Sequence, residues 1–257
     1  MRLSANNSIF IYIFYQYLYR PTPNSLSDFL NCYSKSSPHP ITVVQIGAND
    51  GITHDPIHKF IKRDKWKGVL LEPQKNVFNT LAYLYKKNKG IVTLNAALDT
   101  CDGEGKIYKI AFSEARWANG LTSFNKATLQ SAFDSGYVAE KAREDGLEIP
   151  NDSSACIAEE PVELISPCTL IEKYNLGNID ILQIDTEGYD FEIIKMFLAT
   201  QTTPPLIVFE SKHLSAVDTT NCIAYLTSNH YRTRKFGGNT VALQKVDTRF
   251  ERFFNQP

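Results

Sequence analysis

Two stretches of the sequence combine glycine with side chains that can bind ligands or move protons. The first follows an apolar run and reads Gly47-Ala48-Asn49-Asp50-Gly51. Glycine allows positive φ angles and lets the backbone approach a bound ligand closely. The stretch lacks the three-glycine G-x-G-x-x-G spacing with which dinucleotide-binding folds hold a pyrophosphate. The pattern therefore favours a cofactor without phosphates.

Two further strand ends extend this candidate cofactor site. Glu72 and Pro73 follow the apolar run Gly68–Leu71, and a carboxylate at the carboxyl end of a second strand can accept hydrogen bonds from both hydroxyls of a ribose. Asn95 and Ala96 end the third run, at the position from which an adenine is usually flanked. Alternatively, Glu72 is an ordinary surface acid at a strand end, and Asn95 is an amide that caps its strand.

The second stretch reads Asp185-Thr186-Glu187-Gly188 and follows another apolar run. Its acids could orient a cofactor, bind an acceptor hydroxyl or serve as a general base, while the alternative is helix N-capping by Asp185 and Thr186. Glu210 and His213 follow the fifth run, and a histidine can take a proton near neutral pH, although it can also be an ordinary surface residue. No spacing within this set indicates metal ligands, so we expect no metal here.

Strand-like apolar runs alternate with helical patterns along the chain, and these elements must position the residues above. Such alternation predicts an α/β fold, a mainly parallel sheet with helices on both faces. Turn residues Gly237-Gly238-Asn239 predict a closing hairpin between strands at 231–235 and 240–244. The expected buried strands are 41–46, 68–71, 91–94, 179–184 and 206–209, and the expected helices are 56–63, 76–87, 189–198 and 216–229. Asp55 is expected to cap the first of these helices, with Pro56 in its first position.

Two regions do not follow this alternation of strands and helices. The stretch from about 103 to 161 reads as an insertion, with a strand at 106–112 and a polar helix at 126–147, placed to cover a substrate. An N-terminal helical segment, 1–35, precedes the domain 36–257. Its apolar part, Ile9–Tyr19, is too short to span a bilayer and is expected to pack on the domain's own core. Contact with a membrane surface, or with a second copy in a homo-oligomer, is the alternative.

The composition limits the classes of partner. With 257 residues, 43% hydrophobic and 21% charged, the chain can bury a substantial core. Its formal net charge of −1 offers no general attraction for nucleic acid, which we do not expect as a partner. The five cysteines are odd in number and show no CxxC spacing, which fits reduced thiols in the cytoplasm.

Taken together, these blocks resemble the FkbM family of S-adenosylmethionine-dependent methyltransferases. The similar segments are Val44–Gly51, Leu70–Pro73, Gly120–Phe124, Ile184–Asp190 and Phe209–Ser215. The resemblance covers 41–244 and implies the class I methyltransferase fold, a Rossmann-like seven-stranded sheet in the order 3-2-1-4-5-7-6 with its last strand antiparallel. It also implies that the cofactor is S-adenosylmethionine, bound by Gln45, Gly47, Ala48, Asn49, Gly51, Glu72, Pro73, Asn95, Ala96, Asp185 and Thr186.

One residue of the first motif differs from the pattern of many class I methyltransferases. Many class I enzymes carry an acid near the start of the first motif, where this chain has Gln45. An amide can still form hydrogen bonds, but it brings no charge to offset a sulfonium.

The resemblance implies O-methylation of a hydroxyl on a sugar, glycan or secondary metabolite, with Asp185, Glu187, Glu210 and His213 as candidate catalytic residues. Tyr189, Ser123 and residues of the insertion would lie near the acceptor. The alternatives are an NAD(P)-dependent oxidoreductase on the same kind of sheet, or a non-catalytic module that binds a partner through Ile9–Tyr19.

Overall fold

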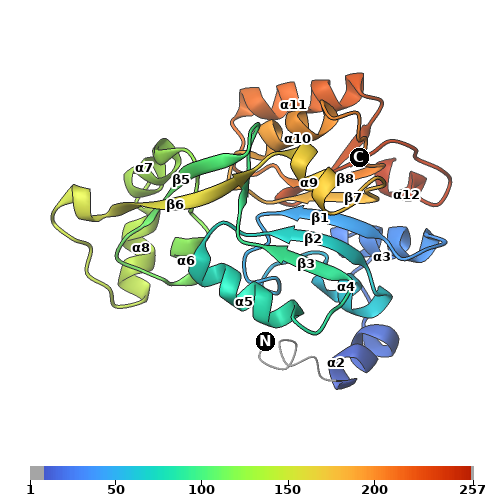
Figure 1. The fold of residues 1–257 in the computed structure, drawn as a ribbon, viewed down its shortest axis with the longest axis horizontal. Helices are drawn as coiled ribbons and strands as arrows, with labels where there is room; N and C mark the ends of the chain where they lie inside the picture. The colour runs from blue at the N-terminus through green and yellow to red at the C-terminus, as the bar shows by residue number, and fades with distance from the viewer. Residues whose placement is uncertain (1–8, 256–257) are drawn as a thin grey trace.

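The computed structural model describes residues 9–255, and a seven-stranded sheet forms its centre (Figure 1). The strands lie in the order β3-β2-β1-β7-β8-β10-β9, and β10 runs antiparallel to both of its neighbours. The expected class I methyltransferase fold is therefore confirmed. The strands are β1 (Thr42–Ile46), β2 (Lys67–Leu71), β3 (Ile91–Leu94), β7 (Ile181–Ile184), β8 (Leu206–Glu210), β9 (Arg232–Phe236) and β10 (Asn239–Leu243).

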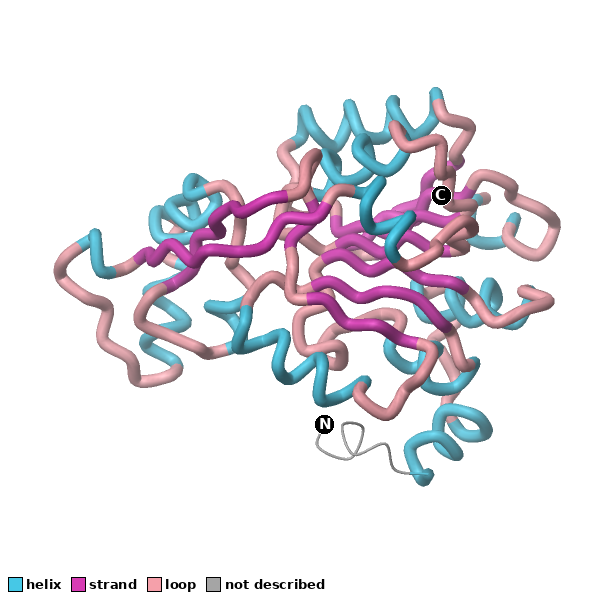
Figure 2. Tube along the Cα trace, in the orientation of Figure 1, coloured by secondary structure: helices cyan, strands magenta, loops and turns pink. Residues whose placement is uncertain are grey.

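Helices cover both faces of this sheet, which is why its strands are apolar on both sides (Figure 2). Successive residues of a strand face opposite sides, so Val43 of β1 belongs to one core cluster and Val44 to the other. The Val43 side holds α3 (Leu26–Ser36), α4 (His58–Asp64), α5 (Lys75–Tyr85) and α12 (Glu251–Phe254). The Val44 side holds α9 (Pro167–Lys173), α10 (Asp190–Leu198) and α11 (Ala216–Ser228).

In the main sheet and the helices that cover it, the ends of the elements shift by at most two residues from the expected ones. The strand expected at 106–112 begins three residues earlier and ends two residues earlier. Helix α4 begins at His58 rather than at Pro56. Its N-cap residue is Ile57 rather than Asp55, but Asp55 Oδ1 still accepts the backbone N–H groups of Ile57 and His58 at 2.7 and 2.8 Å. A carboxylate in this place satisfies N–H groups that have no partner inside the helix.

The region from Ala97 to Ile165 builds a second sheet, three α-helices and a short 3-10 helix beside the main sheet (Figure 1). The expected single helix at 126–147 is wrong, because Gly136 takes a φ of 78° and separates two helices. A strand that contains Glu159, Glu160 and Pro161 was not expected from its composition. The elements are β4 (Ala97–Leu98), β5 (Gly103–Ile110), α6 (Arg116–Asn119), α7 (Lys126–Asp134), α8 (Tyr137–Glu144), η2 (Ser153–Ala155) and β6 (Ile157–Ile165), with strand order β4-β6-β5.

The aromatic segment near the N-terminus is helical, as α2 (Ile9–Ile13) and the π-helical turn η1 (Phe14–Leu18). It contacts the domain only in part: Tyr19 packs against the core cluster on the Val43 side, whereas no residue of α2 or η1 is buried and Phe10 is 78% exposed. The side of the segment that faces the domain also includes residues of η1, which contacts α4. That side carries Tyr15, whose ring lies edge-on to His58 with centroids 6.3 Å apart.

No helix in the range 9–255 combines the length and the apolar character needed to cross a membrane. The five cysteines are unpaired thiols.

Candidate functional site

A cavity of about 900 Å³ lies at the carboxyl ends of β1, β2, β7 and β8. The insertion forms its opposite wall, through residues that include Trp117, Thr128 and Tyr137. Among the residues expected to form the site, Gly51 and Asn95 do not line this cavity. The others do: Gln45, Gly47, Ala48, Asn49, Glu72, Pro73, Ala96, Asp185, Thr186, Glu187, Glu210 and His213.

The turn after β1 is held by backbone contacts. Gly47 has a φ of 77°, and a Cβ at this position would lie 1.9 Å from the carbonyl oxygen of Asp185. The N–H groups of Gly47 and Ala48 both donate to the carbonyl oxygen of Leu71, at 3.1 and 2.8 Å. Glycine is therefore required here because two strand ends approach each other, and this approach places the turn against the cavity.

Gly51, in the same turn, lies against α5. A Cβ on Gly51 would lie 2.6 Å from Leu81 Cδ1 and 3.0 Å from side-chain atoms of Leu84 and Tyr85. The residue thus allows α5 to pack closely under the turn, and it lies outside the cavity lining. Its expected contact with the cofactor stays a prediction.

Glu72 is buried at the end of β2 with only 3% of its surface exposed. Its two carboxylate oxygens each accept a backbone N–H at 2.9 Å, from Asn49 and from Gln74. Burial raises the pKa of Glu72 to about 7, against the opposing effect of these hydrogen bonds. Both oxygens keep a second lone pair for a ligand hydroxyl.

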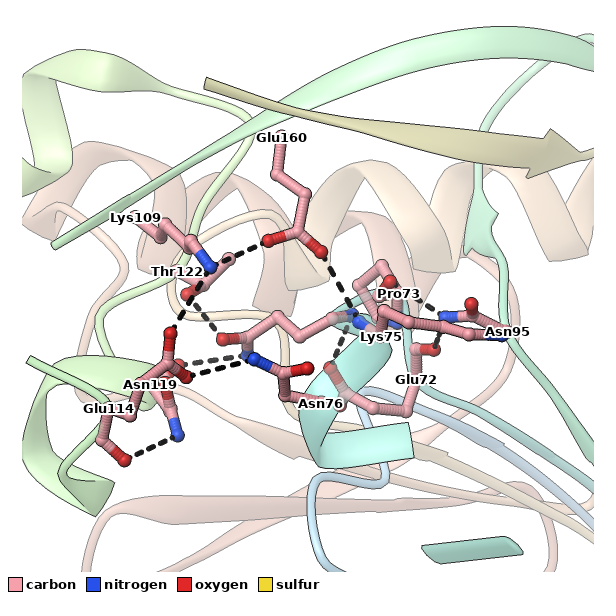
Figure 3. A network of polar contacts seen from close by, with 11 residues as sticks. Glu72, Pro73, Lys75, Asn76, Asn95, Lys109, Glu114, Asn119, Thr122 and Glu160 are labelled. Atoms are coloured by element: carbon pink, nitrogen blue, oxygen red, sulfur yellow. Dashed lines mark hydrogen bonds and ion pairs between the residues drawn. The ribbon is translucent and has the colours of Figure 1, made fainter. Parts of the chain in front are cut away.

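Asn95 supports Glu72 rather than lining the cavity. Its side-chain amide donates to the carbonyl oxygens of Glu72 and Pro73, at 2.9 and 2.8 Å (Figure 3). This is the capping alternative allowed by the sequence, and the residue beside it, Ala96, is the one that reaches the cavity wall.

Figure 3 shows that the loop after Glu72 is also attached to the insertion. Gln74 donates through Nε2 to the carbonyl oxygen of Asn119 at 3.0 Å, and its Oε1 accepts from Thr122 Oγ1 at 2.9 Å. Glu160 of β6 accepts from the backbone N–H of Lys75 at 3.3 Å and pairs with Lys109 at 2.8 Å. One wall of the cavity is thus anchored to the other by side chains that sequence reasoning had not selected.

At the other end of the cavity, three expected residues meet in an ion-pair network. His213 Nε2 lies 2.9 Å from Glu187 Oε2 and 3.6 Å from Glu210 Oε2. Lys212, which was not expected to take part, pairs with Glu210 Oε1 at 2.6 Å. The strand register places Asp185 beside Glu210, because Ile184 pairs with Phe209.

The charges of this network shift two pKa values upward. The pKa of Asp185 lies well above its usual range, first because neighbouring atoms desolvate the carboxyl and then because Glu210 and Glu187 carry like charges. The pKa of His213 is raised mainly by its hydrogen bond to Glu187, which favours the imidazolium. At neutral pH the network therefore holds more protons than isolated side chains would.

Single ligand atoms of Glu187, Glu210 and His213 lie within 4.8 Å of one another, close enough to surround a cation. The side chains of Lys212 and His213 already compensate the two carboxylates. In this arrangement the three residues are suited to moving and holding a proton.

A fully buried acid, Asp190, holds the network in place and was also missed. Its Oδ2 accepts from Thr186 Oγ1 at 3.0 Å, and its Oδ1 accepts from the backbone N–H of Glu210 at 3.1 Å. Burial raises its pKa to about 7. The signal in the sequence was an acid in the first turn of a helix that otherwise presents apolar residues to the core.

Two other polar residues of the cavity floor, Asp55 and Gln183, were not selected for the site. Gln183 is a glutamine within the apolar run Ile181–Ile184 and is 1% exposed. A polar residue inside an otherwise apolar buried strand is the signal that would have identified it.

The chain was compared with known protein families, curated proteins and solved structures. The sequence model of the methyltransferase FkbM domain matches residues 45–233. No curated protein matches the chain. A crystal structure of methyltransferase FkbM from Methylobacillus flagellatus KT is 12% identical, with a TM-score of 0.48, over 90% of this chain and 50% of that one, so the chain spans half its length. The structure of the methyltransferase PaMTH1 from Podospora anserina with bound SAH is 9% identical, with a TM-score of 0.45, over 93% of this chain and 87% of that one.

The strand order, with a glycine turn after the first strand and a buried acid after the second, defines the class I methyltransferases. Within this class the chain belongs to the FkbM methyltransferase family, whose domain spans most of its length.

Proposed function

We propose that the protein transfers a methyl group from S-adenosylmethionine to a hydroxyl group of a sugar, glycan or secondary metabolite. Membership of a methyltransferase family supports the transfer itself. The observation that carries the proposal is a single cavity with a hydroxyl-binding carboxylate, Glu72, at one end and the His213–Glu187 pair at the other.

The residues at the first end fit this cofactor. The carboxylate of Glu72 has free lone pairs for the two ribose hydroxyls, and the turn Gly47–Asn49 leaves room beside them. Ala96 offers an apolar wall for the adenine, and Asp185 and Thr186 line the side that leads to the proton-transfer network. When bound, S-adenosylmethionine supplies a methyl group activated by a positively charged sulfur.

His213 is the proposed general base. Neutral His213 donates its Nε2–H to Glu187 Oε2 and accepts the acceptor's hydroxyl proton at Nδ1, and Glu187 stabilises the imidazolium that results. Asp190 keeps Glu210 beside this pair by holding its backbone N–H. The remaining rate acceleration comes from positioning, because a hydroxyl held in line with the methyl group reacts as if its concentration were very high.

The insertion supplies the proposed acceptor wall. It presents hydroxyl groups on Thr122, Ser123 and Ser131 together with the aromatic rings of Trp117 and Phe124. Tyr189, expected near the acceptor, packs its ring on Phe124 with centroids 5.3 Å apart and lies behind the lining. Such a wall suits an acceptor that carries several hydroxyls on an apolar frame.

The decisive experiment offers labelled S-adenosylmethionine and a panel of sugars, glycans and polyketide-type alcohols to the full-length protein. Methyl transfer to oxygen, located by mass spectrometry and NMR, is the expected result. Titration calorimetry with S-adenosylmethionine and with NAD accompanies it. Binding of NAD alone would refute the proposal in favour of an oxidoreductase, and cofactor binding without transfer to any acceptor would favour a non-catalytic module.

A further inference from the structure

The aromatic segment formed by α2, η1 and Tyr19 contacts the domain along a single row of side chains. Ile11, Tyr15 and Tyr19 are half-buried and follow one another at a spacing of four residues, so they lie on one side of the segment. The other residues of 9–18 are exposed, and all of them except Gln16 are aliphatic or aromatic. The segment therefore presents apolar side chains to the solvent on every side except the one that faces the domain.

The most exposed of these side chains are large. Ile9, Phe10, Tyr17 and Leu18 are each between 65% and 78% exposed. Contiguous exposed apolar surface of this kind marks contact with a protein or with a membrane. A protein partner covers one face of a helix, whereas a helix that lies in the interfacial layer of a bilayer is surrounded by lipid on all of its apolar sides. The distribution of exposed residues around this segment therefore favours lipid.

Positive charge lies beside the aromatic segment. Arg20 follows it directly, and Lys59 Nζ of α4 lies 5.4 Å from the centroid of the Tyr19 ring. Lys62, further along α4, lies with its Nζ 3.5 Å from the carbonyl oxygen of Leu84, which brings α4 against the end of α5 (Figure 1). The lysines of α4 thus connect the aromatic segment to the end of α5.

The end of α5 adds to both the apolar and the charged surface. Tyr83 is 56% exposed, and Lys86 Nζ lies 4.2 Å from the centroid of its ring. Lys87 and Lys89, in the loop that leads to β3, are exposed as well. Long basic side chains around exposed aromatic rings are typical of segments that bind anionic lipid surfaces.

Acidic side chains are scarce in the same part of the chain. The sequence from 9 to 27 contains none. In 56–90 the acids are Asp64, which pairs with Arg63, and Glu72, which is buried at the cavity. A chain with a formal net charge of −1 thus concentrates lysines beside its most exposed apolar residues.

The same charges argue against a second copy of the chain as the partner. In a two-fold symmetric dimer each copy presents the same surface to the other. The lysines of α4 and α5 would then face their counterparts, and like charges repel one another. Anionic headgroups, in contrast, complement them.

We propose that the aromatic segment and the lysines of α4 and of the end of α5 bind the surface of a membrane that contains anionic lipids. The apolar side chains enter the interfacial layer, where tyrosine is favoured, and the lysines contact the headgroup phosphates. This inference does not depend on the proposed function, because the surface includes no residue of the cavity lining.

The test measures flotation of the full-length chain with lipid vesicles. Vesicles of phosphatidylcholine alone are compared with vesicles of an equal mixture of phosphatidylcholine and phosphatidylglycerol. Binding to the mixture is expected to be about tenfold or more stronger than binding to phosphatidylcholine, and to weaken as salt is added.

A first pair of double variants tests the apolar part. Tyr17→Ser/Leu18→Ser should weaken binding to the mixture about tenfold or more. Leu147→Ser/Val217→Ser is the matched control, because both residues are exposed and apolar and lie elsewhere on the molecule, and it should bind like the wild type. Thermal unfolding followed by circular dichroism should be unchanged in both double variants, which separates a loss of binding from a loss of fold.

A second pair tests where the charge must lie. Lys86→Glu/Lys87→Glu should weaken binding to the mixture about tenfold or more. Lys126→Glu/Lys173→Glu changes the net charge by the same amount at exposed lysines of α7 and α9, and it should keep the preference for phosphatidylglycerol.

The outcomes are separable. If the wild type floats with neither kind of vesicle, or if the control variants lose as much binding as the variants they match, the proposal is wrong. Self-association without vesicle binding, measured by analytical ultracentrifugation and lost in Tyr17→Ser/Leu18→Ser, would assign the surface to a second copy instead. Failure of methyl transfer would leave this test unaffected, because it uses neither the cofactor nor an acceptor.

Discussion

The two ends of the cavity hold their acids in opposite ways. Glu72 is fixed by two backbone N–H groups, whereas Glu187 and Glu210 are held by the side chains of His213 and Lys212. Backbone donors stay in place whatever is bound, so the Glu72 end is preorganised for recognition. Side-chain partners can exchange protons and move, so the other end is suited to a step in which charge changes.

The largest expected effect comes from removing the proposed base. His213→Ala should lower kcat by about 10²-fold or more, while calorimetry with S-adenosylhomocysteine shows unchanged affinity. His39→Ala, at an exposed histidine remote from the cavity, is the control. Normal turnover in His213→Ala would move the base to Glu187, Glu210 or Asp185 and remove the contrast between the two ends.

At the recognition end, Glu72→Ala should weaken cofactor binding by about 1–3 kcal/mol, or roughly 5- to 150-fold in Kd. The change removes the ribose acceptor and leaves the N–H groups of Asn49 and Gln74 without their partner. Glu163→Ala is the matched control, because Glu163 is an exposed residue of β6. Unchanged affinity, measured by calorimetry, would refute the role of Glu72.

The same carboxyl gives a pH dependence. Because burial raises the pKa of Glu72 to about 7, the acceptor form is lost as the pH falls through 7. The affinity for S-adenosylhomocysteine should therefore fall between pH 8 and pH 6 in the wild type. In Glu72→Ala the affinity should lose this dependence, and a dependence that persists would assign it to another group.

A substitution at Gly51 tests whether packing of the turn against α5 stabilises the fold. Gly51→Ala should lower the free energy of unfolding by about 1–3 kcal/mol, because the new methyl meets Leu81 and Tyr85. Gly136→Ala has a similar positive φ and no atom within 4 Å, so it reports backbone strain alone. Equal losses in thermal or denaturant unfolding would show that crowding against α5 is unimportant.

The smallest expected effect is a displaced pH profile. A base must be deprotonated, so kcat/KM should rise as the pH increases through the pKa of His213, which Glu187 holds above its ordinary value. Glu187→Gln removes the largest cause of that shift and should move the rise to lower pH. An unmoved rise, measured from pH 5 to 9, would show that another group titrates.

Sequence reasoning located the strand ends because the physics there is local. An apolar run long enough for a strand, followed by glycine or an acid, predicts where a parallel strand meets a ligand. This was enough for Glu72, the turn at Gly47 and the cluster around Asp185 and His213.

What it missed depends on contacts between distant segments. The packing of Gly51 against α5 and the pairing of Gln45 with Gln183 both need the register of neighbouring elements. Periodicity along one segment carries no such information. The break at Gly136 was missed for a different reason, since an isolated glycine in a helical pattern is often tolerated.

Gln74 stands two residues beyond the acid proposed to recognise the ribose, and its amide holds both Asn119 and Thr122 of the insertion. The loop that receives the cofactor is thus also the anchor of the wall that receives the acceptor. If binding of the cofactor strengthens the contact between Gln74 and the insertion, it changes the affinity for the acceptor. Thermodynamic linkage then requires the acceptor to change the affinity for the cofactor by the same factor.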